Sequence, residues 1–109
     1  MFVRWKTRPL RREPREGKAL YAVLVQSTRV NGQPRQKVVR YLAHIKEKFL
    51  WATAHQQWFW ECVDWHLDDL GLDAPMRQRI EEALLPVVPR PTPAELEQLE
   101  RDQRAYAAL

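Results

Sequence analysis

Residues 19–42 read ALYAVLVQSTRVNGQPRQKVVRYL, and this stretch decides the fold. Two runs with the alternation of strands, residues 19–25 and 38–42, flank the pair Asn31-Gly32. Asn-Gly between alternating apolar runs is a strong hairpin signal, because both residues tolerate the positive φ that tight hairpin turns require. The stretch therefore predicts a β-hairpin, and several Lys and Arg residues surround its tip.

A third strand is expected at the N-terminus. Residues 2–6, FVRWK, alternate apolar and basic side chains, as a short edge strand does. Both faces of the run 19–25 are apolar, which indicates a central strand with a neighbour on each side. Residues 7–18 combine two prolines, one glycine and mixed charge, so we expect an exposed loop there. The simplest assembly is a three-stranded antiparallel sheet.

Beyond Ala43 the hydrophobic period changes from two toward 3.6. Residues 48–70 contain neither Gly nor Pro, and Gly71 follows as a helix stop. Apolar residues cover more than half of this helix, which predicts a central helix between the sheet and further helices or a second protomer. The expected apolar stripe holds Trp51, His55, Phe59, Cys62, Val63, His66 and Leu70, with Trp58 and Trp65 beside it. Trp60 falls opposite the stripe, a position typical of an interface.

Two shorter helices are expected after Gly71. Asp73-Ala74-Pro75 places a capping acid before a proline in the first turn and predicts a helix to about residue 85. Residues 86–93, PVVPRPTP, indicate a stiff, extended linker. A capping box with proline at its first helical position, residues 92–95, then starts a third helix.

These elements define an α+β fold: a small three-stranded antiparallel sheet with a basic hairpin, packed on a long central helix and two further helices. A chain of 109 residues has room for one small domain. We expect residues 1–88 to form that domain, with a basic sheet at 1–46 and a helical half at 47–88. Residues 89–109 are expected to be a Pro-rich linker and a C-terminal helix.

The net charge of +4 is unevenly divided along the chain. Residues 1–48 contain thirteen Lys or Arg against three acids, a balance of +10. Residues 49–109 contain five Lys or Arg against eleven acids, a balance of −6. A basic half of this kind is typical of a protein that binds a phosphate backbone, although acidic proteins and anionic lipid also bind basic surfaces.

Composition also bears on location. No apolar run approaches the ~18 residues that a membrane-spanning helix needs. The first three residues lead directly into basic sequence, without the apolar segment of a secretory signal, so export is not expected. The single cysteine, Cys62, permits no internal disulfide and fits a reducing compartment. We expect a cytoplasmic protein without a membrane partner.

Nothing in the sequence indicates an enzyme. His55 and His66 lie three helical turns apart, roughly 16 Å, so they cannot bind one metal ion. Glu61, Asp64 and Asp68 share a helical face, which we interpret as a solvated polar face. The three glycines are scattered and form no phosphate-binding loop. We therefore expect no catalytic residues, no metal and no cofactor.

The hairpin region carries a motif pattern of a known family. The positions concerned are Tyr21, Leu24, Val25, Gln26, Ser27, Arg29, Gly32, Arg35, Gln36, Lys37, Val38, Tyr41 and Leu42. They resemble the N-terminal segment of bacterial insertion-sequence transposases of the DDE type. In those proteins a short basic FVR-like strand precedes a strand of the form YxxLVES.R, and a turn then leads to RQKVL.YLG. The resemblance covers about residues 1–46.

The chain departs from that family in three places. Gln26 stands where the family has an acid, and Ala43-His44 stands where a glycine commonly ends the strand. Residues 49–109 are too short and too helical for the RNase H-like catalytic domain, which carries three separated acids. The resemblance therefore implies a small protein associated with a mobile genetic element that keeps the DNA-contacting module and does not transpose.

The leading hypothesis is a non-enzymatic nucleic-acid-binding module, with DNA favoured as the partner. Phosphates would be contacted by cations around the hairpin, namely Arg29, Arg35, Lys37 and Arg40. Base edges would be read by Asn31, Gln33 and Gln36. On the first strand, Trp5 lies between Arg4 and Lys6, a pattern that fits base stacking as well as core packing.

The alternative hypothesis is a protein-interaction or inhibitor module. Its basic sheet would meet an acidic protein, and its Trp-rich helical half would form an assembly surface or a homodimer. The residues expected at that surface are Trp60, Leu96, Leu99 and Tyr106. This reading predicts a stable oligomer or a stoichiometric complex without nucleic acid.

Overall fold

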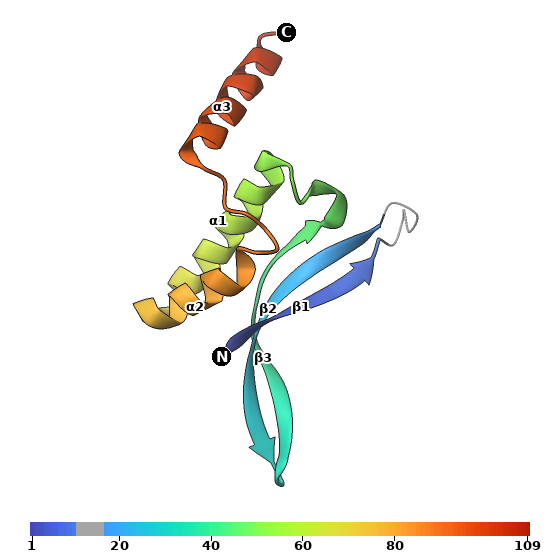
Figure 1. Cartoon of the computed structure of the whole chain (residues 1–109), viewed down its shortest axis with the longest axis vertical. Coiled ribbons are helices and arrows are strands. Elements are labelled where there is room, and N and C mark those ends of the chain that lie inside the picture. The colour runs from blue at the N-terminus through green and yellow to red at the C-terminus, as the bar shows by residue number, and fades with distance from the viewer. Residues whose placement is uncertain (11–16) are drawn as a thin grey trace.

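The computed structural model describes residues 1–10 and 17–109 and confirms the α+β fold. In chain order the elements are β1 Phe2–Pro9, β2 Lys18–Val30, β3 Gln33–Lys46, the 3₁₀ turn η2 Glu47–Phe49, α1 Thr53–Leu70, α2 Ala74–Leu84 and α3 Pro93–Ala107. The three strands form one antiparallel sheet with β2 in the centre, as the two apolar faces of that strand predict (Figure 1).

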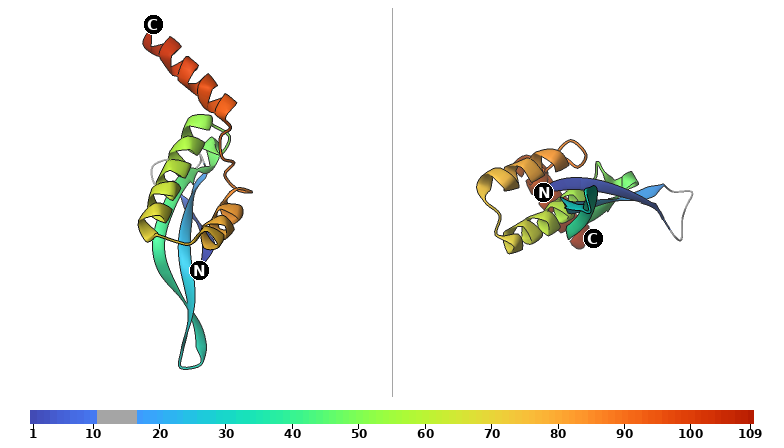
Figure 2. Two further views of the ribbon diagram at one scale, coloured as in Figure 1. Left: turned by 90° about the vertical axis from the view of Figure 1, so that its left-hand side faces the viewer. Right: turned by 90° about the horizontal axis from the view of Figure 1, so that it is seen from below.

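The protein has two layers. Helices α1 and α2 lie on one side of the sheet, α1 against β3 and α2 near β1 (Figures 1 and 2). The core between the layers holds Ala22, Leu24, Leu42, Ala43 and Ile45 from the sheet and Phe59, Trp60, Val63, Leu67, Ile80, Leu84 and Val88 from the helical half. No described helix lies over the opposite side of the sheet, which we call the open face.

The hairpin turn has the predicted conformation. Asn31 and Gly32 both have positive φ, 53° and 78°, and Val30 pairs with Gln33 across the turn. Further along, the pairing shifts twice, which leaves Val39 and Leu42 as extra residues in β3. Such bulges increase the local twist of a strand pair and re-aim the side chains next to them.

The strands are longer than the sequence predicts. β1 continues to Pro9, so residues 7–9 are strand and not loop, whereas residues 11–16 of the expected loop lie outside the described residues. The hairpin strands continue through the mostly polar residues 26–37, which are all exposed, and this outer part projects beyond the helices (Figure 1). Cross-strand hydrogen bonding from a well-formed turn extends the ladder although no core lies beneath it.

The predicted apolar stripe of α1 is only partly its buried face: Phe59 and Val63 are buried, but the buried face is centred elsewhere on the helix. Its buried face consists of Gln56, Phe59, Trp60, Val63 and Leu67. Three tryptophans assigned to the core are largely exposed: Trp51 at 84%, Trp58 at 55% and Trp65 at 63%. Aromatic residues surround this helix on nearly every side, so the apolar pattern alone does not select one face. Contacts with the sheet and α2 select it.

The prediction that Trp60 lies at a surface interface is also wrong, because its side chain is only 2% exposed. Its indole Nε1 donates a hydrogen bond of 3.1 Å to the carbonyl oxygen of Val88. Val88 is itself fully buried, so the Pro-rich segment begins as a docked turn and not as the extended linker that its composition predicts.

The two smaller helices begin as predicted. The Asp73 carboxylate accepts a hydrogen bond from the Met76 amide, and the Thr92 hydroxyl and Glu95 carboxylate form the capping box of α3. α3 has no buried residue and projects away from the two layers (Figure 2). Within it Leu96 and Leu99 are partly exposed and Tyr106 is 80% exposed.

Candidate nucleic-acid interface

Three cations are displayed on the outer part of the hairpin. Arg29 lies on β2, and Arg35 and Lys37 lie on β3; all three are exposed. Residues 17–46 contain no Asp or Glu, and within the described ranges no ion pair joins any of these three cations to a carboxylate. Their charge is therefore left for an external anion.

The amide side chains lie close to these cations. Asn31 and Gln33 stand at the exposed tip. Gln36 accepts a hydrogen bond of 2.7 Å from Arg4 Nη1, which connects the hairpin with β1 across the sheet. The structure thus brings Arg4 beside Gln36 from the far end of the sequence, on the face of the hairpin opposite Arg35 and Lys37.

The first strand divides its side chains as its alternation predicts. Val3 and Trp5 point to the core, where the Trp5 ring stacks on Phe59 with centroids 6.0 Å apart and planes inclined by 12°. Of the two roles expected for Trp5, the structure therefore supports core packing, because the ring is stacked on Phe59. Arg4 and Lys6 are exposed on the open face.

Arg8 joins this exposed row, because β1 continues to Pro9 where a loop was expected. Its guanidinium lies over the ring of Tyr21, 5.5 Å from the centroid. The alternation of basic residues, Arg4 and Lys6, continues two positions further to Arg8. That pattern in the sequence predicts the longer strand and places Arg8 on the same face.

Arg40 lies on the same face of the hairpin as Arg35 and Lys37, but it is engaged by α1. It pairs with Leu24 in the register and faces the helices, where its guanidinium lies 2.9 Å from the Asp69 carboxylate and 3.3 Å from His66 Nδ1. Burial, helped by the Arg40 charge, lowers the pKa of His66, while Asp69 acts in the opposite direction. Arg40 therefore fastens α1 to β3, and its charge is already partnered.

An aromatic group that the sequence did not predict lies on the open face. The ring of His44 lies 5.3 Å from that of Tyr21 and 6.3 Å from that of Tyr41. The Tyr41 hydroxyl and His44 Nδ1 are 2.5 Å apart, and burial raises the pKa of Tyr41 to about 12. Tyr41 is 40% exposed on this face.

The acidic half forms its own ion pairs on the helical layer. Asp64 accepts hydrogen bonds from Arg90 at 3.0 and 3.1 Å, and Arg77 pairs with Asp64, Asp68 and Glu81. These contacts, the Asp68 hydrogen bond first, raise the pKa of Arg77. Asp64 and Asp68 are therefore bound to arginines, whereas Glu61 is exposed, so the expected solvated face is found only in part.

Across residues 1–10 and 17–109, no group of His, Cys, Asp and Glu side chains is arranged to hold a metal ion. The helices in the same ranges are too short or too polar to cross a bilayer. Comparisons with protein-family models, with curated proteins and with solved structures find no match. The resemblance of residues 1–46 to insertion-sequence transposases therefore remains a prediction.

Proposed function

We propose that the protein is a non-enzymatic nucleic-acid-binding module, with DNA as the favoured partner, that lays the outer hairpin against a phosphate backbone. The observation that carries this proposal is a projecting ribbon whose own sequence holds no acid and which exposes cations on both faces, Arg29 on one and Arg35 and Lys37 on the other. Association with a mobile genetic element rests on the resemblance of residues 1–46 and is part of the same proposal.

The dimensions of the hairpin suit a groove. From Gln26 to Val30 the ribbon extends about 13 Å, and its two backbones are about 5 Å apart. A two-stranded ribbon of this width enters the major groove of B-DNA, which is about 12 Å wide. Arg29, Arg35 and Lys37 would then meet the phosphates, while Asn31 and Gln33 at the tip reach base edges.

The test is binding to double-stranded DNA over a series of salt concentrations, with Arg29→Ala/Arg35→Ala/Lys37→Ala beside the native protein. Loss of three phosphate contacts should reduce the log-log salt slope by about 2–3 units, because each contact contributes about 0.9. The matched control is Arg79→Ala/Arg101→Ala/Arg104→Ala, which removes the same charge from exposed positions on α2 and α3.

Equal losses in the two triple variants would mean that net charge, and not the hairpin, drives binding. An unchanged slope in the hairpin variant would contradict the proposal outright. Arg40 is left out of the variant because removing it would break its contacts with Asp69 and His66 and disturb the fold.

A protein-interaction module is the second candidate, favoured by the exposure of Trp51, Trp58 and Trp65 and by a third helix without buried residues. Such a role is open to Leu96, Leu99 and Tyr106, which are accessible. Trp60 is buried and cannot take part in it. Light scattering of the purified protein tests this function: a stable dimer that Trp51→Ala/Trp65→Ala converts to monomer supports it, and a monomer at all concentrations counts against self-assembly.

A further inference from the structure

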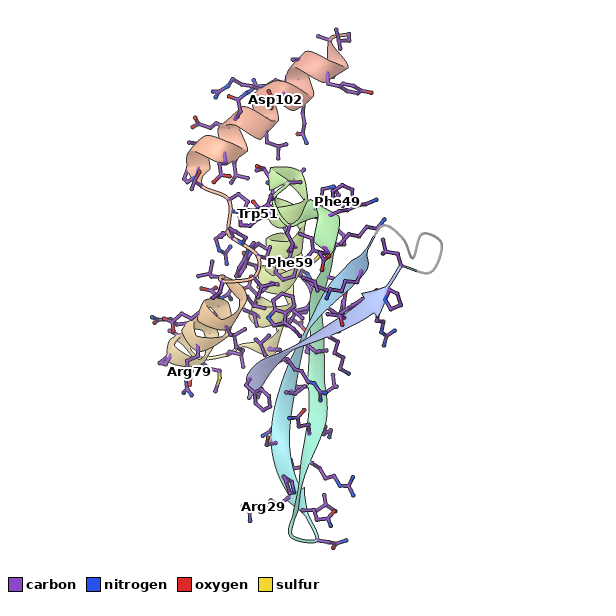
Figure 3. All side chains as sticks on the ribbon, turned by 45° about the vertical axis from the view of Figure 1, so that its right-hand side comes forward. Arg29, Phe49, Trp51, Phe59, Arg79 and Asp102 are labelled. Atoms are coloured by element: carbon purple, nitrogen blue, oxygen red, sulfur yellow. The ribbon has the colours of Figure 1, made fainter. Side chains whose placement is uncertain are left out.

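The aromatic group on the open face ends at a hollow. This hollow has a volume of about 400 Å³ and lies between the end of β3, η2 and the first turns of α1; its lining includes His44, Lys46, Phe49, His55 and Trp58. Figure 3 shows Phe49 and Arg29 at opposite ends of the hairpin strands. The hollow is therefore separate from the hairpin tip, about 30 Å along β3 when measured from Lys37 to Lys46 at the usual rise per residue.

The walls of the hollow are rings. The Phe49 and His55 rings are stacked with centroids 4.0 Å apart and planes inclined by 5°. His44 and Trp58 approach each other edge to face at 6.1 Å, and Trp58 remains 55% exposed. Tyr21 and Tyr41 extend this row of rings onto the open face. The exposed rings of this group, above all Trp58, suit a planar, unsaturated ligand.

The surrounding charge is positive. Lys46 lines the hollow, and Arg8 lies over Tyr21 at the other end of the row of rings. Glu47 is the one acid among residues 17–60, and it lies 3.7 Å from the Lys18 ammonium. Rings beside cations are the combination that binds single-stranded nucleic acid, in which bases stack and phosphates are neutralised.

We propose that the row His44, Trp58 and Tyr41 is a stacking platform for unpaired bases, with Lys46 and Arg8 near the phosphates of the same strand. The inference rests on the proposed function and deepens it, since it assigns the partner class: a nucleic acid with a single-stranded segment next to the part that the hairpin holds. A duplex has no free base faces to offer such a platform, except at its ends.

The experiment compares two fluorescently labelled DNA probes by anisotropy titration. One is a blunt duplex, and the other is the same duplex with a single-stranded tail of about twelve nucleotides, within the range that single-strand-binding folds cover. The variant is Trp58→Ala, and the control is Trp65→Ala, another exposed tryptophan on α1 that does not line the hollow. Trp58→Phe restores a stacking surface and guards against a general effect of substitution.

Native protein should bind the tailed probe about tenfold more tightly than the blunt one, because stacked bases add to the hairpin contacts. Trp58→Ala should lose most of this preference, while Trp65→Ala and Trp58→Phe should keep it. Equal affinity of the native protein for the two probes would overturn the inference, as would equal effects of Trp58→Ala and Trp65→Ala. Dissociation of a dimer by both alanine variants, with DNA binding unchanged, would assign this surface to protein contacts and also overturn it.

The hairpin triple variant separates the two proposals. If it binds the blunt probe as tightly as the native protein, the proposed function of the hairpin fails. If the triple variant binds the blunt duplex more weakly than the native protein does, but the native protein binds the two probes with equal affinity, only the proposal of the stacking platform fails.

Discussion

The indole Nε1 of Trp60 and the carbonyl oxygen of Val88 are joined by a buried hydrogen bond of 3.1 Å. The guanidinium of Arg90 lies over the same indole, 4.1 Å from its centroid, and is held there by Asp64. The chain is thus fixed to α1 as far as Arg90, whereas α3 begins at Pro93 and buries nothing. The packed part of the chain therefore ends near Arg90, the last residue that contacts Trp60.

Replacing Trp60 by Phe should lower the free energy of unfolding by about 2 kcal/mol, because the buried Val88 carbonyl loses its donor. Chemical denaturation followed by circular dichroism measures the change. Trp65→Phe is the control, since its exposed ring should change stability by no more than about 0.5 kcal/mol. Equal stability of the two variants would show that the hydrogen bond contributes nothing.

Asp64→Asn should destabilise the protein by about 1 kcal/mol at low salt, because Asp64 holds Arg90 and Arg77 at the surface of the helical layer. The loss should shrink as salt is added, since these groups are partly exposed. Glu100→Gln is the matched control: its pair with Arg104 is longer, 3.8 Å, and both side chains are largely exposed. A salt-independent loss in Asp64→Asn would contradict the electrostatic explanation.

His66 should make stability depend on pH. Arg40 can only donate, so His66 Nδ1 accepts and the ring is neutral in the folded protein. Because its folded pKa lies below the unfolded value near 6.5, the unfolded state binds the proton first, and stability should fall as pH drops below about 7. Thermal unfolding of native protein and His66→Gln between pH 5 and 8 tests this expectation, and identical pH profiles would refute it.

Gly32 and Gly71 both have positive φ, 78° and 62°, and both have open space where a Cβ would stand. Alanine at either position should therefore cost about 1–2 kcal/mol locally, through backbone strain alone. Gly71→Ala should lower global stability, because Gly71 terminates the packed helix α1. Gly32→Ala should mainly speed amide hydrogen exchange in residues 26–37, because that ribbon has no core beneath it. Equal losses of global stability would show that the hairpin tip folds cooperatively with the core.

Local signals in the sequence were sufficient for the elements themselves. The Asn31-Gly32 turn, the Asp73 cap and the capping box at Thr92 all form as predicted, because each depends on residues close together in the chain. The length of the hairpin was underestimated, since the ladder continues through polar residues that alternation of apolar side chains does not detect.

For the candidate site, the sequence predicts the exposed cations Arg29, Arg35 and Lys37. It does not predict that Arg40 and Trp5 are engaged in contacts with α1 and so do not belong to the nucleic-acid interface. Val39 and Leu42 are extra residues in β3, and the resulting register turns Arg40 toward α1. Alternation places Trp5 on one face with Val3, but only the structure shows that this face is covered, by Phe59. The aromatic row of Tyr21, Tyr41, His44 and Trp58 likewise comes from three elements that are distant in the chain.

The sequence by itself determined the α+β class, the order of the strands, the hairpin turn and the uneven division of charge. Only the tertiary structure decided which tryptophans are buried, which cations are already partnered and where rings gather beside a hollow. The physical reason is that turns and caps are satisfied within a few residues, whereas burial depends on which distant surface covers a side chain. An aromatic helix such as α1 offers several apolar faces, and contacts with the sheet, α2 and Val88 chose the one that holds Phe59, Trp60 and Val63.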